Sequence, residues 1–301
     1  MKVAVTGSSG LIGSALVRAL AADGHEVLRL VRRTPRTADE HRWEPGLHRI
    51  PPGLLDDVDA VVNLAGVGVG DRRWTAKHKE QVLRSRVDST TTVSRALAEG
   101  AAADPTRPRV LLSASAVGWY GDTGSRVVTE EDPAGDDFLA RVCVEWEAAT
   151  APAADAGVRV ATLRTGLVLG PGGLLGRLAP LFRLGLGGKL GSGDQYMPWI
   201  GLQDEVDAIR FLLTASVSGP VNLSAPTPVT NAEFTAAFAA AVHRPAVLTV
   251  PGPALQLVLG EFARVGVLAG QRAVPAVLES AGFRFRQPEL PGALAAALTR
   301  G

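Results

Sequence analysis

Residues 6–13 read TGSSGLIG, and the rest of the fold is organised around this turn. The residues before it, Lys2–Thr6, form a short run rich in β-branched side chains, which is typical of a strand. The residues after it, LIGSALVRALAADG (11–24), place apolar side chains at helical spacing. The sequence therefore predicts a strand, a glycine-rich turn and a helix in immediate succession.

Three glycines divide the turn in a G-x-x-G-x-x-G pattern, and each has a separate use. Gly7 permits the tight turn, Gly10 lets a diphosphate approach the backbone, and Gly13 lets the helix pack closely against the strand. A glycine pattern also suits a strand–helix turn that binds nothing, but its place between a clear strand and a clear helix favours dinucleotide binding. The residues of this turn that we expect to contact a cofactor are Gly7, Ser9, Gly10, Leu11, Ile12 and Gly13.

The second predicted strand, His25–Val31, is followed by two arginines, Arg32 and Arg33. An NAD site usually places an acidic residue here to hold the ribose 2′-hydroxyl, whereas arginines attract a 2′-phosphate through charged hydrogen bonds. The alternative is an ordinary solvated basic strand end, because arginine is common on protein surfaces. We expect NADP to be preferred over NAD.

Strand and helix patterns alternate through the first half of the chain. Apolar runs at 58–66, 107–121 and 158–170 predict buried strands, and the second of these contains hydroxyl side chains near its end. Helical spacing covers 74–100 and resumes at Phe138. Near-continuous apolar strands separated by helices predict an α/β fold with a doubly wound parallel sheet.

Composition argues against several classes of protein. The 301 residues carry a formal net charge of +1, which gives no reason to expect nucleic acid or a membrane as a partner. One cysteine excludes an intramolecular disulfide framework. The five histidines have no ligand-type spacing, so no metal site is expected, and no G-x-S-x-G elbow indicates a hydrolase. Without a signal-peptide core or an apolar run of roughly 20 residues, we expect a cytoplasmic protein.

The order of these motifs resembles the extended short-chain dehydrogenase/reductase superfamily. TGSSGLIG, NLAG, SAS and RTGLVLGPGG stand in the expected sequence, and GSGDQYMPWIGLQDEVDAI (191–209) resembles the segment that closes the substrate cleft of sugar-nucleotide epimerases. The tail, from LGEFARVGVLAGQRAVPAVLESAGFRF to PELPGALAAAL, resembles the C-terminal extension of an atypical epimerase-like branch that has no settled substrate. The resemblance covers essentially the whole chain.

The resemblance implies a Rossmann-type NADP-binding domain over residues 1–165 and a smaller α/β substrate lobe over 166–301, with a chain that can cross between them. It also implies a small-molecule substrate and a possible homodimer. Gly201 stands where the family's H-x-x-D motif has its histidine, so no role of that histidine carries over. Arg86, on the helix after NLAG, could bind a phosphate, hold substrate or be a solvated cation. The remaining residues expected at the cofactor are Leu64, Ala65, Gly66, Gln81, Arg86, Ser113 and Val168.

Ordinary members of the superfamily use a serine, a tyrosine and a lysine four residues after the tyrosine. A free phenol is a poor base near neutral pH, so the lysine is needed to lower its pKa. The resemblance places this pair in FLARVCVEWEAAT (138–150), which contains neither residue, and neither tyrosine of the chain has a lysine four residues later. Cys143 and Glu147 share one helix face there, and a one-residue shift would instead place Val142 and Trp146 at the two positions.

Three residues are the candidate catalytic groups without that pair. Tyr120 directly follows a predicted strand and could donate a proton, although an aromatic residue here also commonly packs in the cleft. Ser115, or Ser113 in its place, could hold the substrate oxygen, and Glu147 could relay a proton or be a surface carboxylate. Cys143 is more consistent with a small buried hydrophobic side chain, and a neighbouring carboxylate would raise its pKa.

Two functions from different classes remain open. The first is an NADP-dependent oxidoreductase or epimerase-like enzyme acting on a small polar or nucleotide-linked carbonyl or hydroxyl substrate, which the retained cleft segment favours. The second is a non-catalytic NADP(H)-binding sensor or scaffold, which the missing pair favours. The enzyme is our expectation.

Overall fold

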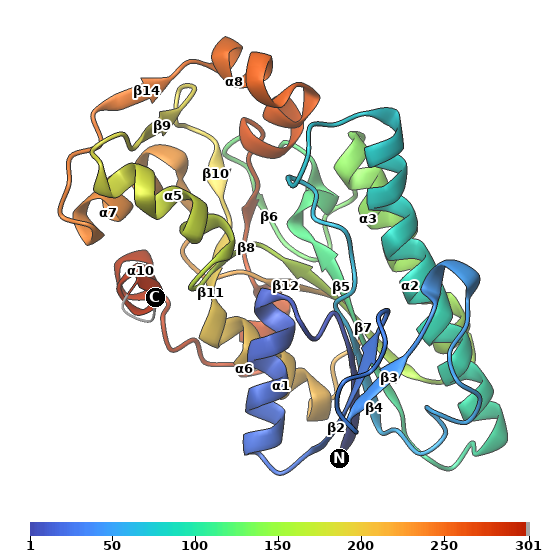
Figure 1. The fold of residues 1–301 in the computed structure, drawn as a ribbon. Coiled ribbons are helices and arrows are strands. Elements are labelled where there is room, and N and C mark those ends of the chain that lie inside the picture. Colours follow the sequence, from blue (N-terminus) through green and yellow to red (C-terminus); the bar gives the residue numbers. More distant parts are fainter. Residues whose placement is uncertain (299–301) are drawn as a thin grey trace.

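The centre of the fold is a parallel β-sheet. The structure, a computed structural model, describes residues 1–298, and within that range seven parallel strands pair in the order β12-β7-β5-β4-β1-β2-β3 (Figure 1). The direction of winding reverses between β1 and β4, which is where ligands bind in doubly wound sheets. The predicted α/β doubly wound sheet is confirmed. Its strands are β1 (Lys2–Thr6), β2 (Glu26–Val31), β3 (Glu40–Arg42), β4 (Ala60–Asn63), β5 (Val110–Ala116), β7 (Arg159–Thr165) and β12 (Gly219–Leu223).

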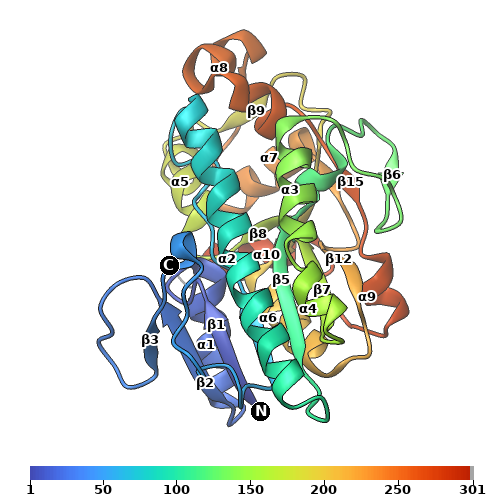
Figure 2. The ribbon, with the colours of Figure 1, turned by 90° about the vertical axis from the view of Figure 1, so that its right-hand side faces the viewer.

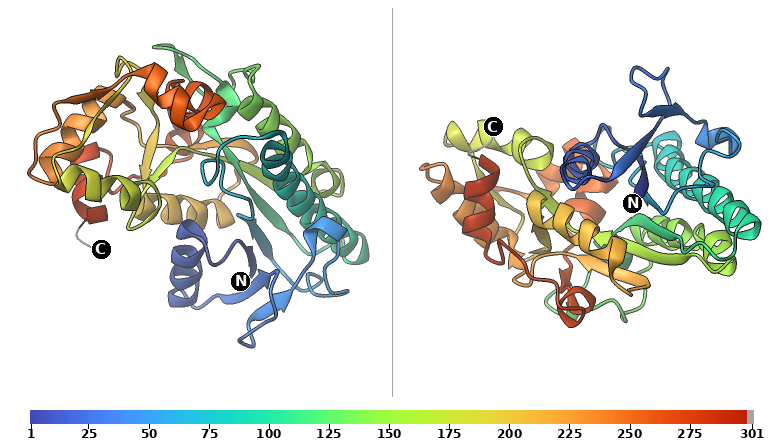
Figure 3. Two further views of the ribbon diagram at one scale, coloured as in Figure 1. Left: turned by 45° about the horizontal axis from the view of Figure 1, so that its top comes forward. Right: turned by 90° about the horizontal axis from the view of Figure 1, so that it is seen from below.

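Helices cover both faces of this sheet. Helices α1 and α6 pack together on one face, and α2, α3 and α4 lie on the other; Figure 2 shows α2 and α3 side by side, and Figure 3 shows blue α1 and gold α6 on one side of the strands and teal α2 on the other. Side chains cap the N-termini of α2 and α3: Thr75 accepts a hydrogen bond from the N–H of His78, and Asp137 accepts one from the N–H of Ala140. Their bounds are α1 (Leu11–Ala22), α2 (Ala76–Ala103), α3 (Phe138–Ala148), α4 (Ala151–Asp155) and α6 (Leu202–Thr214).

Two of the predicted strands are shorter than their apolar runs. The run 107–121 contains β5 and then, from Val117 to Tyr120, a short 3₁₀ turn, η2. The run 158–170 is divided between β7 and β8 at Gly166, where a Cβ atom would lie 2.6 Å from the carbonyl oxygen of Pro198. Apolar character continues through both breaks, so the hydrophobic pattern alone could not locate them.

A smaller lobe is built from short strand pairs and helices around Trp199, Phe234 and Phe238. Within this lobe β8 pairs with β11, β9 with β14 and β10 with β13, whereas the pair of β6 with β15 packs against Val117 and Tyr120 instead. The strands are β6 (Val127–Val128), β8 (Leu167–Leu169), β9 (Gly188–Leu190), β10 (Tyr196–Met197), β11 (Trp199–Gly201), β13 (Val229–Thr230), β14 (Leu248–Val250) and β15 (Arg272–Ala273). Its core is contributed by the helices α5 (Gly173–Arg183), α7 (Asn231–Ala241) and α10 (Leu290–Leu298). The remaining helix α8 (Gly252–Leu259) lies next to the helical turn η3 (Ala263–Val267), whereas α9 (Ala276–Ser280) packs against β12 and the helical turn η1 (Pro45–Leu47) against α2.

The second half of the chain returns to the central sheet. Strand β12 pairs with β7, and Glu130 accepts the backbone N–H groups of Asn222 on β12 and Val277 on α9, at 2.9 and 3.2 Å. Asp204 on α6 likewise accepts the N–H groups of Arg286 and Gln287. The division of domains at residue 165 stays a prediction. No helix in the described part of the chain is long and apolar enough to cross a membrane.

Candidate cofactor site and the buried polar network

The glycine turn is packed so closely that two of its positions accept only glycine. Gly7 has a φ of +64°, and a Cβ atom there would lie 2.6 Å from the carbonyl oxygen of Leu64. A Cβ atom on Gly13 would lie 2.2 Å from the carbonyl oxygen of Gly7. The turn is therefore held between α1 and the end of β4, as a dinucleotide-binding turn requires.

The first turn of α1 is available to an anion. Its N-cap is Gly10, which has no side chain to accept a hydrogen bond, and no acidic residue lies in that turn. The N–H groups from Leu11 to Gly13 therefore have no capping side chain. Helix N-termini of this kind bind the diphosphate of a dinucleotide, so the residues present fit such a cofactor.

A cavity of about 700 Å³ opens in front of the turn, between the ends of β2 and β4 and one face of α2. The predicted cofactor residues that line it are Gly7, Ser9, Gly10, Arg32, Arg33, Leu64, Ala65 and Gly66. Ser85, Asp88 and Ser89 also line it, and their i, i+3, i+4 spacing on a predicted helix could have revealed them. Trp43 lines it as well, but it follows β3, a strand that the sequence analysis missed.

The two arginines of the cavity have different surroundings. Arg33 forms a bidentate ion pair with Glu40, with N–O distances of 2.6 and 2.7 Å, and this pair lowers the pKa of Glu40 to about 2. Arg32 is exposed and has no ion pair with any residue between 1 and 298. Arg32 is therefore the free cation, and Glu40 fixes the orientation of Arg33.

Helix α3 presents Cys143 and Glu147 to the end of β5. The Sγ atom of Cys143 lies 3.6 Å from the carbonyl oxygen of Ala116, whereas Trp146 turns toward α2 and donates to Thr90 Oγ1 at 3.0 Å. Burial, followed by the Glu147 carboxylate, raises the pKa of Cys143 to about 12. The expected direction of this shift is confirmed, and the thiol is neutral near pH 7.

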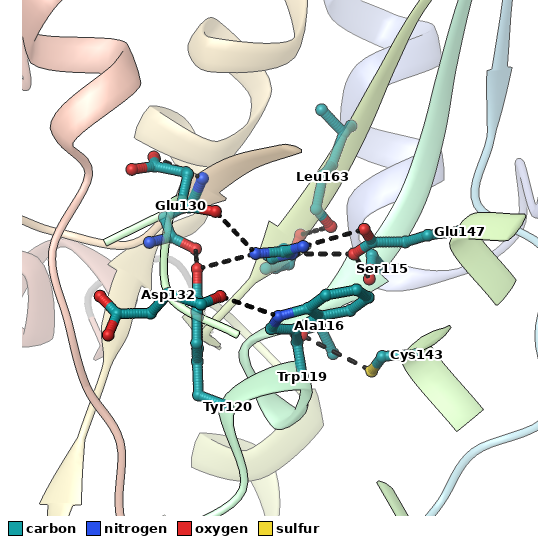
Figure 4. A network of polar contacts seen from close by, with 12 residues as sticks. Ser115, Ala116, Trp119, Tyr120, Glu130, Asp132, Cys143, Glu147 and Leu163 are labelled. Carbon is teal, nitrogen blue, oxygen red and sulfur yellow. Dashed lines mark hydrogen bonds and ion pairs between the residues drawn. The ribbon is translucent and has the colours of Figure 1, made fainter. Parts of the chain in front are cut away.

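Ser115 and Glu147 belong to one buried cluster with Arg164 (Figure 4). The Ser115 hydroxyl donates to Glu147 Oε1 at 2.6 Å, and Arg164 contacts both carboxylate oxygens, through Nε at 2.9 Å and Nη2 at 3.0 Å. The side chains of Arg164 and Glu147 are only 3% and 12% exposed. A lone cation within an apolar strand needs a buried counter-charge, and this signal could have predicted that a partner exists.

Tyr120 lies at the other end of the same cluster, and Figure 4 shows it on the side of Glu130 and Asp132, across from Ser115 and Glu147. Its hydroxyl donates to Asn222 Oδ1 at 2.7 Å and accepts from Arg164 Nη1 at 3.2 Å. Burial raises its pKa to about 12. Its role as a proton donor stays a prediction, and these contacts weigh against it because the phenolic O–H already donates its hydrogen bond to Asn222.

The other predicted site residues lie outside the cavity wall. Gln81 is exposed on α2, and Val168 is half-buried on β8. Ser113 is fully buried, and its Oγ has no hydrogen-bond partner among residues 1–298. Arg86 lies over Gly66 on the side that faces α3. Some residues expected at the cofactor do not line the cavity, and their contact with a cofactor stays a prediction. They are Leu11, Ile12, Gly13, Gln81, Arg86, Ser113 and Val168.

Two protein-family models match most of the chain. The model described as the NAD dependent epimerase/dehydratase family matches residues 3–224. The chain belongs to this family. A domain of unknown function, DUF1731, matches residues 250–297, so the predicted family and its C-terminal extension are both confirmed.

Relatives match the chain along its whole length. It is 52% identical over 300 residues to the epimerase family protein Mb2239 of Mycobacterium bovis, covering 99% of this chain and 98% of that protein. The crystal structure of human epimerase family protein SDR39U1 with NADPH is 34% identical, with a TM-score of 0.89 and 99% of both chains covered. A nucleoside-diphosphate sugar epimerase from Corynebacterium glutamicum is 40% identical, with a TM-score of 0.81, and covers 99% of this chain and 58% of its own.

Proposed function

We propose that this protein binds NADP(H) in the cavity in front of the glycine turn. The first turn of α1 would hold the diphosphate, Arg32 with Arg33 would hold the 2′-phosphate, and Ala65 and Gly66 would border the path between them. The observation that carries this proposal is Arg32, which has no ion pair within residues 1–298, beside an open glycine turn. The NADPH in the human relative supports it.

We further propose that the protein is an oxidoreductase or epimerase-like enzyme acting on a small polar or nucleotide-linked carbonyl or hydroxyl compound. When bound, NADPH supplies a hydride, and the protein supplies position and electrostatic stabilisation. The retained second lobe and the similarity to a nucleoside-diphosphate sugar epimerase support this class of substrate. A cytoplasmic location and a homodimer remain predictions.

One observation favours a second candidate, a non-catalytic NADP(H)-binding sensor or scaffold. Where ordinary family members carry tyrosine and lysine, this chain has a neutral buried thiol and a carboxylate that is already paired with Arg164. Neither group is free to move a proton.

The experiment that tests the proposal has two stages. NADPH and NADH are first titrated into the purified protein, and NADPH should bind at least about 10-fold more tightly, which corresponds to about 1.4 kcal/mol. Equal affinities would contradict the assignment of the cofactor. Carbonyl compounds are then screened by following NADPH consumption, with Tyr120→Phe beside the wild type. Turnover of Tyr120→Phe at the wild-type rate would exclude Tyr120 as the acid, and tight NADPH binding without any turnover would favour the sensor.

A further inference from the structure

Arg86 carries a cationic side chain that is turned away from bulk solvent. Its guanidinium carbon lies 4.9 Å from the centre of the Trp146 ring and 3.4 Å from the position that a Cβ atom on Gly66 would occupy. Burial lowers its pKa below the ordinary value. The half-buried charge therefore lies between the end of β4 and helix α3.

No carboxylate compensates this charge. Nη1 of Arg86 donates to the carbonyl oxygens of Val67 and Val82, each at 2.9 Å, and no ion pair to Arg86 occurs within residues 1–298. Arg84, two residues earlier on the same helix, is exposed and has Asp88 at 3.9 Å. Arg86 is half-buried, so its charge is only partly solvated, and binding an anion would supply the missing counter-charge.

The anions of NADP do not account for Arg86. In the proposed binding mode the diphosphate binds at the first turn of α1, and the 2′-phosphate binds Arg32 and Arg33. Helix α2 contributes Ser85 and Ser89 to the cavity wall, but Arg86 lies on the other side of Gly66, toward α3. Its charge is therefore directed at the region where ordinary family members place their catalytic pair.

We propose that Arg86 binds the carboxylate of a small carbonyl substrate, so that the substrate class is anionic. Nη1 is occupied by backbone oxygens, and Nε and Nη2 remain to form two parallel hydrogen bonds, an arrangement that suits a planar carboxylate. Stacking on Trp146 fixes the plane of the guanidinium. The inference rests on the proposed function, because it places the substrate beside a bound cofactor.

The test measures binding and does not require a known substrate. Oxalate and inorganic phosphate are titrated by calorimetry into protein saturated with NADP⁺, using the wild type, Arg86→Met, Arg86→Lys and the control Arg84→Met. Oxalate should bind the wild type and Arg84→Met equally, Arg86→Met about 10-fold or more weakly, and Arg86→Lys in between, because lysine keeps the charge but loses the fork. Affinity for NADPH should stay within about 3-fold in all four proteins.

Each other outcome overturns the assignment. Oxalate that binds Arg86→Met as well as the wild type, or does not bind the wild type at all, refutes a carboxylate site at Arg86. If Arg86→Met loses affinity for NADPH, Arg86 binds the cofactor and not the substrate. If the wild type binds phosphate more tightly than oxalate, the site does not prefer a carboxylate. The wild-type NADPH titration tests the proposed function separately. If Arg86→Met does not fold, Arg86→Lys alone must still bind oxalate more weakly than the wild type does.

Discussion

Replacing Glu147 by glutamine should destabilise the protein strongly. The carboxylate accepts two hydrogen bonds from Arg164 and one from Ser115, and both charged side chains are almost completely buried. Glu147→Gln keeps the shape of the side chain but removes its charge. Arg164 is then left as a buried cation without a counter-charge, which is the costly half of such a pair.

The size of the effect follows from the burial of the pair. Removing one partner of a buried ion pair costs about 3–5 kcal/mol. An unfolding entropy of about 2.1 cal/mol/K per residue gives roughly 0.6 kcal/mol/K for 301 residues, so each kcal/mol lowers Tm by about 1.6 °C. Glu147→Gln should therefore lower Tm by about 5–8 °C.

Calorimetric melting of three variants measures this. Glu145→Gln is the matched control, because Glu145 lies on the same helix and is exposed; its Tm should stay within about 1 °C of the wild type. Glu147→Gln combined with Arg164→Met should recover much of the loss, because neither charge then remains buried alone. A Glu147→Gln protein that melts with the wild type would refute the reasoning, and a loss of turnover at unchanged Tm would instead support the predicted proton relay.

Three further predictions concern the cofactor, the cysteine and a second buried acid. Arg32→Glu should weaken NADPH binding by about 10-fold or more and spare NADH, because Arg32 has no ion pair in the described chain; equal losses for both would contradict this. Cys143→Ala should leave NADPH binding intact, and Cys143→Ser should cost more stability, because it buries a hydroxyl; rapid thiol modification of the native protein, blocked by NADPH, would show instead that Cys143 lines the cleft. Burial raises the pKa of Glu205 from 4.5 to about 8, although Thr165 donates a hydrogen bond to it. The contribution of Glu205 to folding stability is therefore complete below pH 4.5 and is lost as pH rises toward 8, because its carboxyl group ionises in the unfolded chain at a lower pH than in the folded protein. Glu205→Gln should thus gain stability over the wild type between pH 5 and pH 8 in urea unfolding, and a difference that is the same at both pH values would disprove the raised pKa.

Local patterns were sufficient to predict the doubly wound parallel sheet and the glycine turn, but not the edge strand β3. Gly13 is constrained by Gly7 and Ser8, which are close in sequence, and Gly7 has a positive φ that favours glycine, so the motif carries most of the information; the contact of Gly7 with Leu64 depends on the fold. Contacts across long stretches of sequence could not be predicted in this way. The hydrogen bond from Tyr120 to Asn222 joins residues 102 positions apart, and Arg164 reaches Glu147 from a different element. The charge of such residues signals that a partner exists, but only the fold identifies which residue it is.

The candidate catalytic residues stabilise one another, and this changes what chemistry the site can perform. A carboxylate at Glu147, inside the protein, requires a cation, and Arg164 provides it from β7. The Ser115 hydroxyl donates a hydrogen bond to that carboxylate, and the Tyr120 oxygen accepts one from the same arginine. Groups paired in this way are poorly placed to exchange protons with a substrate. Arg86 has no ion pair within residues 1–298, so reduction of a carbonyl here would depend on electrostatic stabilisation of the substrate by this cation.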